Sequence, residues 1–306
     1  MKRRILVIKL GALGDFVLAT GPFAAIRDAH PDDEIVLLTT APYTQMGRSC
    51  GLFDEVWMDE RPSRFDFLGI YRLRQKLRGG HFVRVYDLQT SGRSAWYFWL
   101  MRSLERPQWS GIAPGASHPH ANRNRNTMHT IERQAEQLAM AGIPQTPFPD
   151  LSWLSSDISH LELPNRYALL IPGGARHRAK KRWPPEHYRE IATLFASRGF
   201  LPVVIGGRNE LNLAERIANG GPARSIVGKT TLADIAELAR HAAVSVGNDT
   251  GPMHIAAICG CPCLVLFSNA SNPDITAPRG NDVTILQRQD LKDLSVSEVA
   301  AALRLR

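Results

Sequence analysis

The sequence predicts an α/β protein made of two doubly wound domains, each built on a parallel sheet. The chain has 306 residues, which exceeds the size at which one hydrophobic core usually keeps growing. Short apolar runs alternate with segments of helical spacing, and this alternation restarts after a proline-rich stretch. We therefore expect one domain over residues 1–150 and another over 151–306, with the boundary between about residues 142 and 163. Ligands of such domains bind at the carboxyl ends of the strands.

The first half contains four short apolar runs that are typical of strands, at residues 5–8, 34–39, 55–57 and 82–88. Helical spacing relates Phe67, Ile70, Leu73 and Leu77, which predicts a helix before the fourth strand. Residues 110–126 are rich in Gly, Pro, His, Asn and Arg, so we expect a long loop, and a helix over 130–141 follows. Prolines at 144, 147 and 149 indicate a linker.

The second half repeats the same alternation of strands and helices. Pro184 and Pro185 open a helix whose apolar residues recur on one face, and an apolar segment typical of a strand lies on either side of it. The expected strands are 167–171, 203–205, 243–246 and 263–267, and the expected helices are 185–198, 209–218, 231–240 and 296–305.

Composition and charge limit the classes of protein to consider. The chain is 44% hydrophobic and 22% charged, as in globular enzymes, and its formal charge of +8 favours an anionic partner. Nucleic acid, a phosphorylated small molecule, an acidic membrane surface and a generally basic surface with no specific role all fit that charge. Cys259, Cys261 and Cys263 alternate in an apolar segment without zinc-site spacing, so we expect buried reduced thiols.

The N-terminus imitates a signal peptide, because three basic residues precede the apolar run 5–8. Lys9 and Asp15 interrupt that run before it reaches signal length, and no stretch of about 18 apolar residues occurs. We expect a cytosolic chain.

A glycine-rich turn follows the first strand at residues 9–15, Lys-Leu-Gly-Ala-Leu-Gly-Asp. It lacks the third glycine of a dinucleotide fingerprint and the Gly-Lys-Ser/Thr ending of a phosphate loop. What remains is a carboxylate, Asp15, at the carboxyl edge of the sheet. Asp15 could equally cap the helix that follows.

Two further motifs each join a strand to a helix. Residues 171–174, Ile-Pro-Gly-Gly, are followed by five cations in seven positions, a density that suits a diphosphate, although a solvated basic loop is the alternative. Residues 247–254, Gly-Asn-Asp-Thr-Gly-Pro-Met-His, lead into a helix whose first backbone N–H groups would face an anion. The five cations are Arg176, Arg178, Lys180, Lys181 and Arg182.

These motifs together resemble the lipopolysaccharide heptosyltransferases of glycosyltransferase family 9. The resemblance rests on residues 11–15 with Thr-Gly-Pro at 20–22, on Lys-Arg-Trp at 181–183, and on residues 248–256, in that order. It implies a GT-B fold, in which two Rossmann-like domains with parallel sheets face an interdomain cleft. It also implies an inverting transfer of a sugar, with no metal and no cofactor, from a nucleotide donor that is most simply ADP-heptose.

The resemblance assigns roles to particular residues. Asp15 is the expected general base, and Lys181, expected as an exposed cation, meets the donor phosphates. Basic side chains of the first domain, which the resemblance makes the acceptor-binding one, are expected to bind a phosphorylated or Kdo-bearing glycolipid: Arg72, Arg93, Arg123 and Arg125. The second domain is expected to bind the donor, with Gly14 of the first domain as a further contact. Its own expected donor-binding residues are Glu210, Thr230, Asp249, Thr250, Gly251, Met253 and His254.

Two departures from the family pattern leave the donor sugar open. Residues 267–271, Phe-Ser-Asn-Ala-Ser, replace an expected glycine-rich turn, and Arg-His-Arg at 176–178 stands where hydroxyl residues are common. A family member that uses another nucleotide sugar therefore remains an alternative, as does a GT-B-like nucleotide-sugar epimerase or oxidoreductase. Peripheral contact with the inner membrane is also expected. A nucleic-acid-binding protein is disfavoured, because no recognition motif accompanies the charge.

Overall fold

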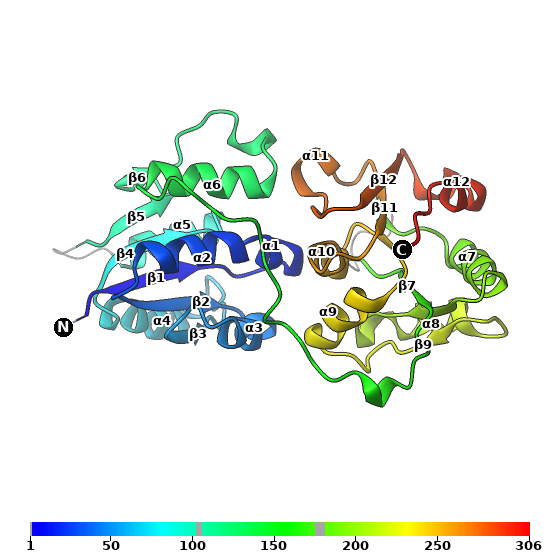
Figure 1. Ribbon diagram of the computed structural model, residues 1–306. Helices are drawn as coiled ribbons and strands as arrows, with labels where there is room; N and C mark the ends of the chain where they lie inside the picture. The colour runs from blue at the N-terminus through cyan, green and yellow to red at the C-terminus, as the bar shows by residue number, and fades with distance from the viewer. Residues whose placement is uncertain (1, 102–105, 175–180) are drawn as a thin grey trace. The chain divides into compact units, whose positions relative to one another are not determined.

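The computed structural model describes residues 2–101, 106–174 and 181–306 (Figure 1). The chain forms two compact units, Met1–Pro149 and Asp150–Arg306, here called the N-terminal and C-terminal units. Arg176, Arg178 and Lys180, three of the cations singled out in the sequence, lie outside the described residues.

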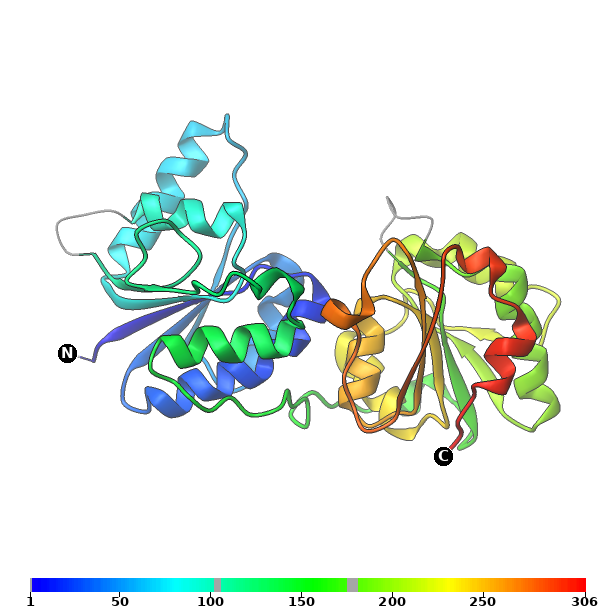
Figure 2. The ribbon, with the colours of Figure 1, turned by 90° about the horizontal axis from the view of Figure 1, so that it is seen from above.

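The N-terminal unit is a six-stranded sheet in the order β3-β2-β1-β4-β5-β6, and every pairing is parallel. Figure 2 shows α4 and α5 on one face of this sheet and α2 and α6 on the other. The strands are β1 (Arg4–Ile8), β2 (Glu34–Thr39), β3 (Glu55–Met58), β4 (Phe82–Asp87), β5 (Gln108–Gly111) and β6 (His118–Pro119). The helices are α1 (Leu13–Leu18), α2 (Thr20–Ala29), α3 (Thr44–Ser49), α4 (Phe67–Gly79), α5 (Gly92–Leu100) and α6 (Thr130–Met140).

The C-terminal unit is a second parallel six-stranded sheet, in the order β12-β11-β10-β7-β8-β9. Read from its other edge, this order repeats that of the N-terminal unit: third, second, first, fourth, fifth and sixth strand. The strands are β7 (Tyr167–Ile171), β8 (Leu201–Val204), β9 (Arg224–Ser225), β10 (Ser245–Asn248), β11 (Cys263–Ser268) and β12 (Val283–Arg288). The helices are α7 (Pro185–Ser197), α8 (Leu211–Ala218), α9 (Leu232–His241), α10 (Gly251–Ile258), α11 (Pro273–Thr276) and α12 (Val296–Ala301).

Each unit has its own hydrophobic core. In the N-terminal unit, Leu6, Val36 and Trp109 of the sheet pack against Leu77 of α4. In the C-terminal unit the sheet packs against α7 around Trp183 and Phe195, both fully buried. The central strands are buried on both sides, which explains why they read as continuous apolar runs in the sequence.

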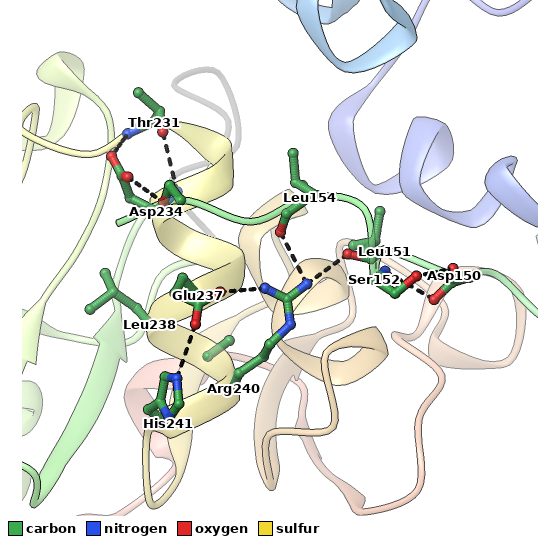
Figure 3. A network of polar contacts seen from close by, with 12 residues as sticks. Asp150, Leu151, Ser152, Leu154, Thr231, Asp234, Glu237, Leu238, Arg240 and His241 are labelled. Atoms are coloured by element: carbon green, nitrogen blue, oxygen red, sulfur yellow. Dashed lines mark hydrogen bonds and ion pairs between the residues drawn. The ribbon is translucent and has the colours of Figure 1, made fainter. Parts of the chain in front are cut away.

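The segment that opens the C-terminal unit is fixed to α9 (Figure 3). The Arg240 guanidinium donates to the carbonyl oxygens of Leu151 at 2.7 Å and Leu154 at 3.0 Å. The same guanidinium pairs with Glu237 at 2.7 Å. Both leucine side chains are buried, so Leu151 and Leu154 anchor this segment to the C-terminal unit.

The predicted α/β class with two parallel sheets is confirmed, but one prediction about the first half is wrong. Residues 110–126 are not simply a loop, because β5 and β6 reach into this stretch and complete the sheet. These two strands have four and two residues and carry no β-branched side chain, so pairing with β4 decides their conformation. Among the described residues, no helix is long and apolar enough to cross a membrane.

Candidate active site

The turn after β1 can be formed only with glycine at position 11. Gly11 has φ +126°, and a Cβ there would lie 2.6 Å from the Tyr43 ring. The Tyr43 ring stacks on Phe16 of α1, with 5.3 Å between the ring centroids. This contact fixes the start of α1, and therefore Asp15, at the carboxyl end of β1.

Asp15 lies in the first turn of α1 and is partly exposed. Its carboxylate accepts a hydrogen bond from the Ala12 backbone N–H at 3.3 Å. The capping contact that the sequence left open is therefore present. It is compatible with a second role, because the side chain retains access to solvent.

A pocket of about 530 Å³ lies beside this turn. It is lined at the carboxyl ends of β1, β2 and β4, where a parallel sheet usually binds its ligands. Arg61 and Arg93 bring two cations to it, and Gly11, Ala12 and Tyr43 form its other side. Arg93 also lines a neighbouring pocket of about 450 Å³ with Arg64 and Trp96. The N-terminal unit thus presents a cationic surface next to the Asp15 turn.

Two buried polar residues, Lys9 and Asp87, lie at the same edge of the sheet. The Lys9 ammonium is almost fully buried and donates to the Leu88 carbonyl at 3.1 Å. Burial lowers the pKa of Lys9, while the nearby Asp15 and Asp87 carboxylates oppose that shift. Asp87 is fully buried, and its desolvation raises its pKa to about 6 although the N–H groups of Gln89 and Thr90 donate to it. Lys9 therefore lies buried beneath the Asp15 turn, within electrostatic reach of the Asp15 and Asp87 carboxylates.

The other three arginines of the expected acceptor site lie in different surroundings. Arg125 is half-buried beside His120. Burial lowers the pKa of Arg125, and the Asp87 carboxylate opposes that shift. Arg123 is exposed in the same segment, and Arg72 is exposed on α4. Among the described residues, neither Arg72 nor Arg123 lines the two pockets beside the Asp15 turn. Of the four arginines expected to bind the acceptor, Arg93 is the one that lines the pocket beside this turn.

In the C-terminal unit, Asn248 joins two of the three motifs. Its amide nitrogen donates to the carbonyls of Pro172 at 2.8 Å and Gly173 at 3.3 Å. Its amide oxygen accepts from the Trp183 backbone N–H at 3.0 Å and from the Tyr188 hydroxyl at 3.1 Å. Asn248 is fully buried at the end of β10, so these contacts hold the loop after β7 against that strand.

Lys181 forms an ion pair with Asp249, the residue that follows Asn248. Both side chains are about nine-tenths buried, so the expectation of an exposed Lys181 is wrong. The physical reason is that a neighbouring carboxylate, 68 positions away in the sequence, compensates the charge of the lysine and permits its burial. The pair lies beside the start of α10, where Thr250 is the N-cap residue and its side chain makes no capping hydrogen bond.

Glu210 ends a 3₁₀ turn directly before α8, and Thr230 lies in the loop before α9 of the same unit. The Glu210 side chain packs over Gly173 and Gly206, within 3.4 and 3.3 Å of the positions that added Cβ atoms would occupy. The Thr230 hydroxyl oxygen is buried and has no hydrogen-bond partner among the described residues. Glu210 therefore contacts the same Gly173 loop that Asn248 holds.

The other residues expected to bind the donor lie in the first turn of α10, apart from Gly14, which is buried in α1 of the N-terminal unit. Gly251 is the first helical residue, and Met253 and His254 are buried in the first turn. A Cβ at Gly247 would lie 2.6 Å from the Met253 sulfur, so this glycine lets α10 pack closely on β10.

Sequence reasoning did not assign roles to Lys9, Tyr43, Arg61, Gln89 or Asn248. Lys9 and Asn248 lie inside motifs that were recognised, and their position at strand ends could have identified them. Gln89 accepts from the Leu10 N–H at 2.8 Å, and Tyr43 and Arg61 line the pocket, all through contacts between distant segments. No local signal in the sequence indicates these three.

Two doubly wound sheets with charged loops at their carboxyl edges are the architecture of the GT-B class of glycosyl-transferring enzymes. Residues 70–301 match the model of glycosyltransferase family 9 (heptosyltransferase), and the chain belongs to this family. Lipooligosaccharide heptosyltransferase 2 of Haemophilus ducreyi is 23% identical to it over 312 residues, which cover 94% of this chain and 89% of that protein.

Solved structures show the same fold. A glycosyl transferase of family 9 from Veillonella parvula superposes with a TM-score of 0.84 at 20% identity, covering 99% of this chain and 96% of that one. ADP-heptose lps heptosyltransferase II of E. coli superposes with a TM-score of 0.77 at 22% identity, covering 98% and 97%. These likenesses confirm the predicted GT-B fold.

Proposed function

We propose that this enzyme is an inverting, metal-independent heptosyltransferase that transfers heptose from ADP-heptose to a lipopolysaccharide core or a related glycolipid. Its family membership and the names of the similar enzymes, which include ADP-heptose and lipopolysaccharide, support this donor and acceptor. The observation that carries the proposal is the Lys181–Asp249 pair beside the start of α10, held by Asn248 at the carboxyl edge of the sheet.

On the donor side, a diphosphate would compete with Asp249 for the Lys181 ammonium. The backbone N–H groups at the start of α10 provide a second, uncharged source of positive potential. Together they would stabilise the negative charge that develops on the leaving nucleoside diphosphate without a divalent ion. Glu210 packs against Gly173, and from there it would accept hydrogen bonds from the ribose hydroxyls of the donor.

On the acceptor side, Asp15 would act as the general base. It takes the proton from an acceptor hydroxyl while that oxygen attacks the anomeric carbon opposite the diphosphate. The bond from the anomeric carbon to the phosphate oxygen breaks, its electron pair leaves with ADP, and the configuration inverts. Arg61 and Arg93, which line the adjacent pocket, would hold anionic groups of the acceptor.

The test is turnover of ADP-heptose by the wild type and by Asp15→Asn, with and without a lipopolysaccharide-core acceptor and in the presence of EDTA. Asparagine keeps the shape and the capping ability of aspartate but accepts no proton. We expect turnover in the variant to fall by about 100-fold or more, the scale of general-base loss, with ADP affinity and melting temperature unchanged. EDTA should leave the wild-type rate unaffected.

Near-normal turnover of Asp15→Asn would reject the catalytic role and leave Asp15 as a helix cap. Loss of activity in EDTA that Mg²⁺ restores would reject the metal-independent mechanism. A nucleotide-sugar epimerase, the alternative from another class, would convert the donor without any acceptor and release no ADP. The panel should therefore also include GDP-, UDP- and dTDP-sugars, because a donor that binds raises the melting temperature by mass action.

A further inference from the structure

The start of α4 and the turn before it expose a cluster of large apolar side chains, here called the aromatic tip. It consists of Phe65, Phe67, Leu68 and Tyr71, which are 79%, 77%, 59% and 55% exposed. Phe67, Leu68 and Tyr71 are one, three and four positions apart, so they share one side of the helix. Soluble proteins rarely expose such a cluster unless it contacts a partner.

The rest of α4 holds the aromatic tip in place. Asp66 caps α4, and its carboxylate accepts from the Gly69 N–H at 2.8 Å. On the opposite side of the helix, Leu73 and Leu77 are buried in the core of the N-terminal unit. Figure 2 shows the first turn of α4, in light blue, extending beyond the sheet that the rest of the helix covers. The apolar side chains are therefore presented by a fixed helix.

Positive charge surrounds the aromatic tip. Between residues 60 and 78 the sequence has six Lys or Arg side chains and only two acidic residues, Glu60 and Asp66. Arg74 and Arg78 continue the side of the helix on which Phe67 and Tyr71 lie, seven and eleven positions after Phe67. Apolar rings at one end and cations along the rest of one side suit the surface of a bilayer that carries anionic lipid.

We propose that the aromatic tip and the arginines around it dock the N-terminal unit on an anionic lipid bilayer. The aromatic rings enter the interfacial region of the lipid, and Arg74 and Arg78 contact the head groups. This goes beyond the proposed function, because a transferase can act on a glycolipid head group without touching the bilayer itself. An apolar protein partner is disfavoured by the excess of positive charge.

The position of the tip adds a second argument. Arg61 and Arg64, in the turn that leads to the tip, line the two pockets beside the Asp15 turn. Docking of the tip would bring those pockets close to the membrane surface, where the head group of a lipid-linked acceptor lies. The surface and the pockets are thus parts of one continuous region of the N-terminal unit.

The experiment is co-sedimentation of the full chain with vesicles of phosphatidylethanolamine and phosphatidylglycerol, without donor or acceptor. Vesicles of phosphatidylcholine alone measure the dependence on charge. We expect the wild type to bind the anionic vesicles, and the triple variant Phe65→Ser/Phe67→Ser/Tyr71→Ser to bind them at least about tenfold more weakly. Arg74→Gln/Arg78→Gln should weaken binding by about tenfold too, and high salt should release the wild type.

Phe148→Ser is the matched control, because Phe148 is an exposed aromatic residue of the same unit, 55% accessible and remote in sequence from α4. It should bind vesicles as the wild type does. Melting temperature and turnover with a water-soluble acceptor that lacks acyl chains should be unchanged in the triple variant.

Wild-type vesicle binding by the triple variant would overturn the proposal, and so would equal binding of the wild type to phosphatidylcholine. A matching loss of turnover with the acyl-free acceptor would also overturn it, because the tip would then hold the acceptor and not the bilayer. Vesicle binding needs no donor, so an enzyme that binds vesicles but transfers no heptose would refute only the proposed function.

Discussion

At the scale of single residues, the proposed donor role of Lys181 predicts that its ion pair with Asp249 couples donor binding to stability. Lys181→Met removes the proposed phosphate contact and leaves the Asp249 carboxylate nearly buried without its counter-charge. We expect ADP binding at least about tenfold weaker and a loss of unfolding free energy of about 3 kcal/mol, the cost of an unpaired buried charge. Calorimetric ADP titration and denaturant unfolding would measure the two effects.

The double variant Lys181→Met/Asp249→Asn separates the two contributions. Asparagine removes the uncompensated charge, so stability should largely recover while ADP binding stays weak. If the single variant unfolds like the wild type, the pair does not contribute to stability. If the double variant regains ADP affinity, Lys181 does not bind the donor phosphates.

The same pair illustrates what the sequence can and cannot reveal about a site. The motifs around Lys181 and Asp249 were visible because each joins a strand to a helix. Their pairing was not, because the two residues lie 68 positions apart, and a lysine among other cations gives no sign of being buried. Asn248 was likewise read as part of a motif, whereas its contacts to Pro172 and Trp183 appear only in three dimensions.

At the scale of elements, the packing of β10 on β7 sets the position of the proposed donor loop. A Cβ at Gly247 would lie 2.7 Å from the Ile171 Cβ and 2.9 Å from the Ile171 carbonyl oxygen, and backbone atoms cannot yield as a flexible side chain can. We expect Gly247→Ala to lower the unfolding free energy by about 2 kcal/mol, as overpacked cores do. Denaturant unfolding would measure it.

Gly79→Ala is the control for that substitution. Nothing lies within 4 Å of a Cβ at this last residue of α4, so alanine should be neutral or stabilise by about 0.5 kcal/mol through its helix propensity. Equal destabilisation by both substitutions would contradict the packing argument.

Strands were predictable where burial on both faces gives a long apolar run. Tyr167–Ile171 was predicted with the bounds that the structure gives to β7. The predicted strand 243–246 begins two residues later, at Ser245, because pairing with β7 and β11, and not composition, sets its ends. The edge strand β12 (Val283–Arg288) was not predicted, because it is only half-buried and so lacks a long apolar run.

At the scale of the whole molecule, the separate cores predict that a fragment of residues 150–306 folds by itself. Leu151, Leu154 and Leu161 are each at most 5% exposed, and Arg240 binds the carbonyls of the first two. We expect this fragment to unfold in one cooperative transition and to gain melting temperature with ADP. Calorimetry with and without ADP would show both.

A fragment of residues 163–306 is the control, since it lacks those three leucines, including the two whose carbonyls accept from Arg240. It should melt lower than the 150–306 fragment, because burial of the leucines contributes to stability. A 150–306 fragment that shows no cooperative transition would contradict the independence of the two cores.

The repeated strand order has a consequence for how such an enzyme diversifies. Both units follow the same path through their sheets, and in both, two residues with proposed roles follow the first and fourth strands: Asp15 and Arg93 after β1 and β4, and Lys181 and Asp249 after β7 and β10. Each half therefore supplies an equivalent pair of loops on an independently packed scaffold. Mutations in the loops of one half leave the other core untouched. Under the proposed function, recognition of the sugar to be transferred and of the molecule that receives it would therefore drift at separate evolutionary rates.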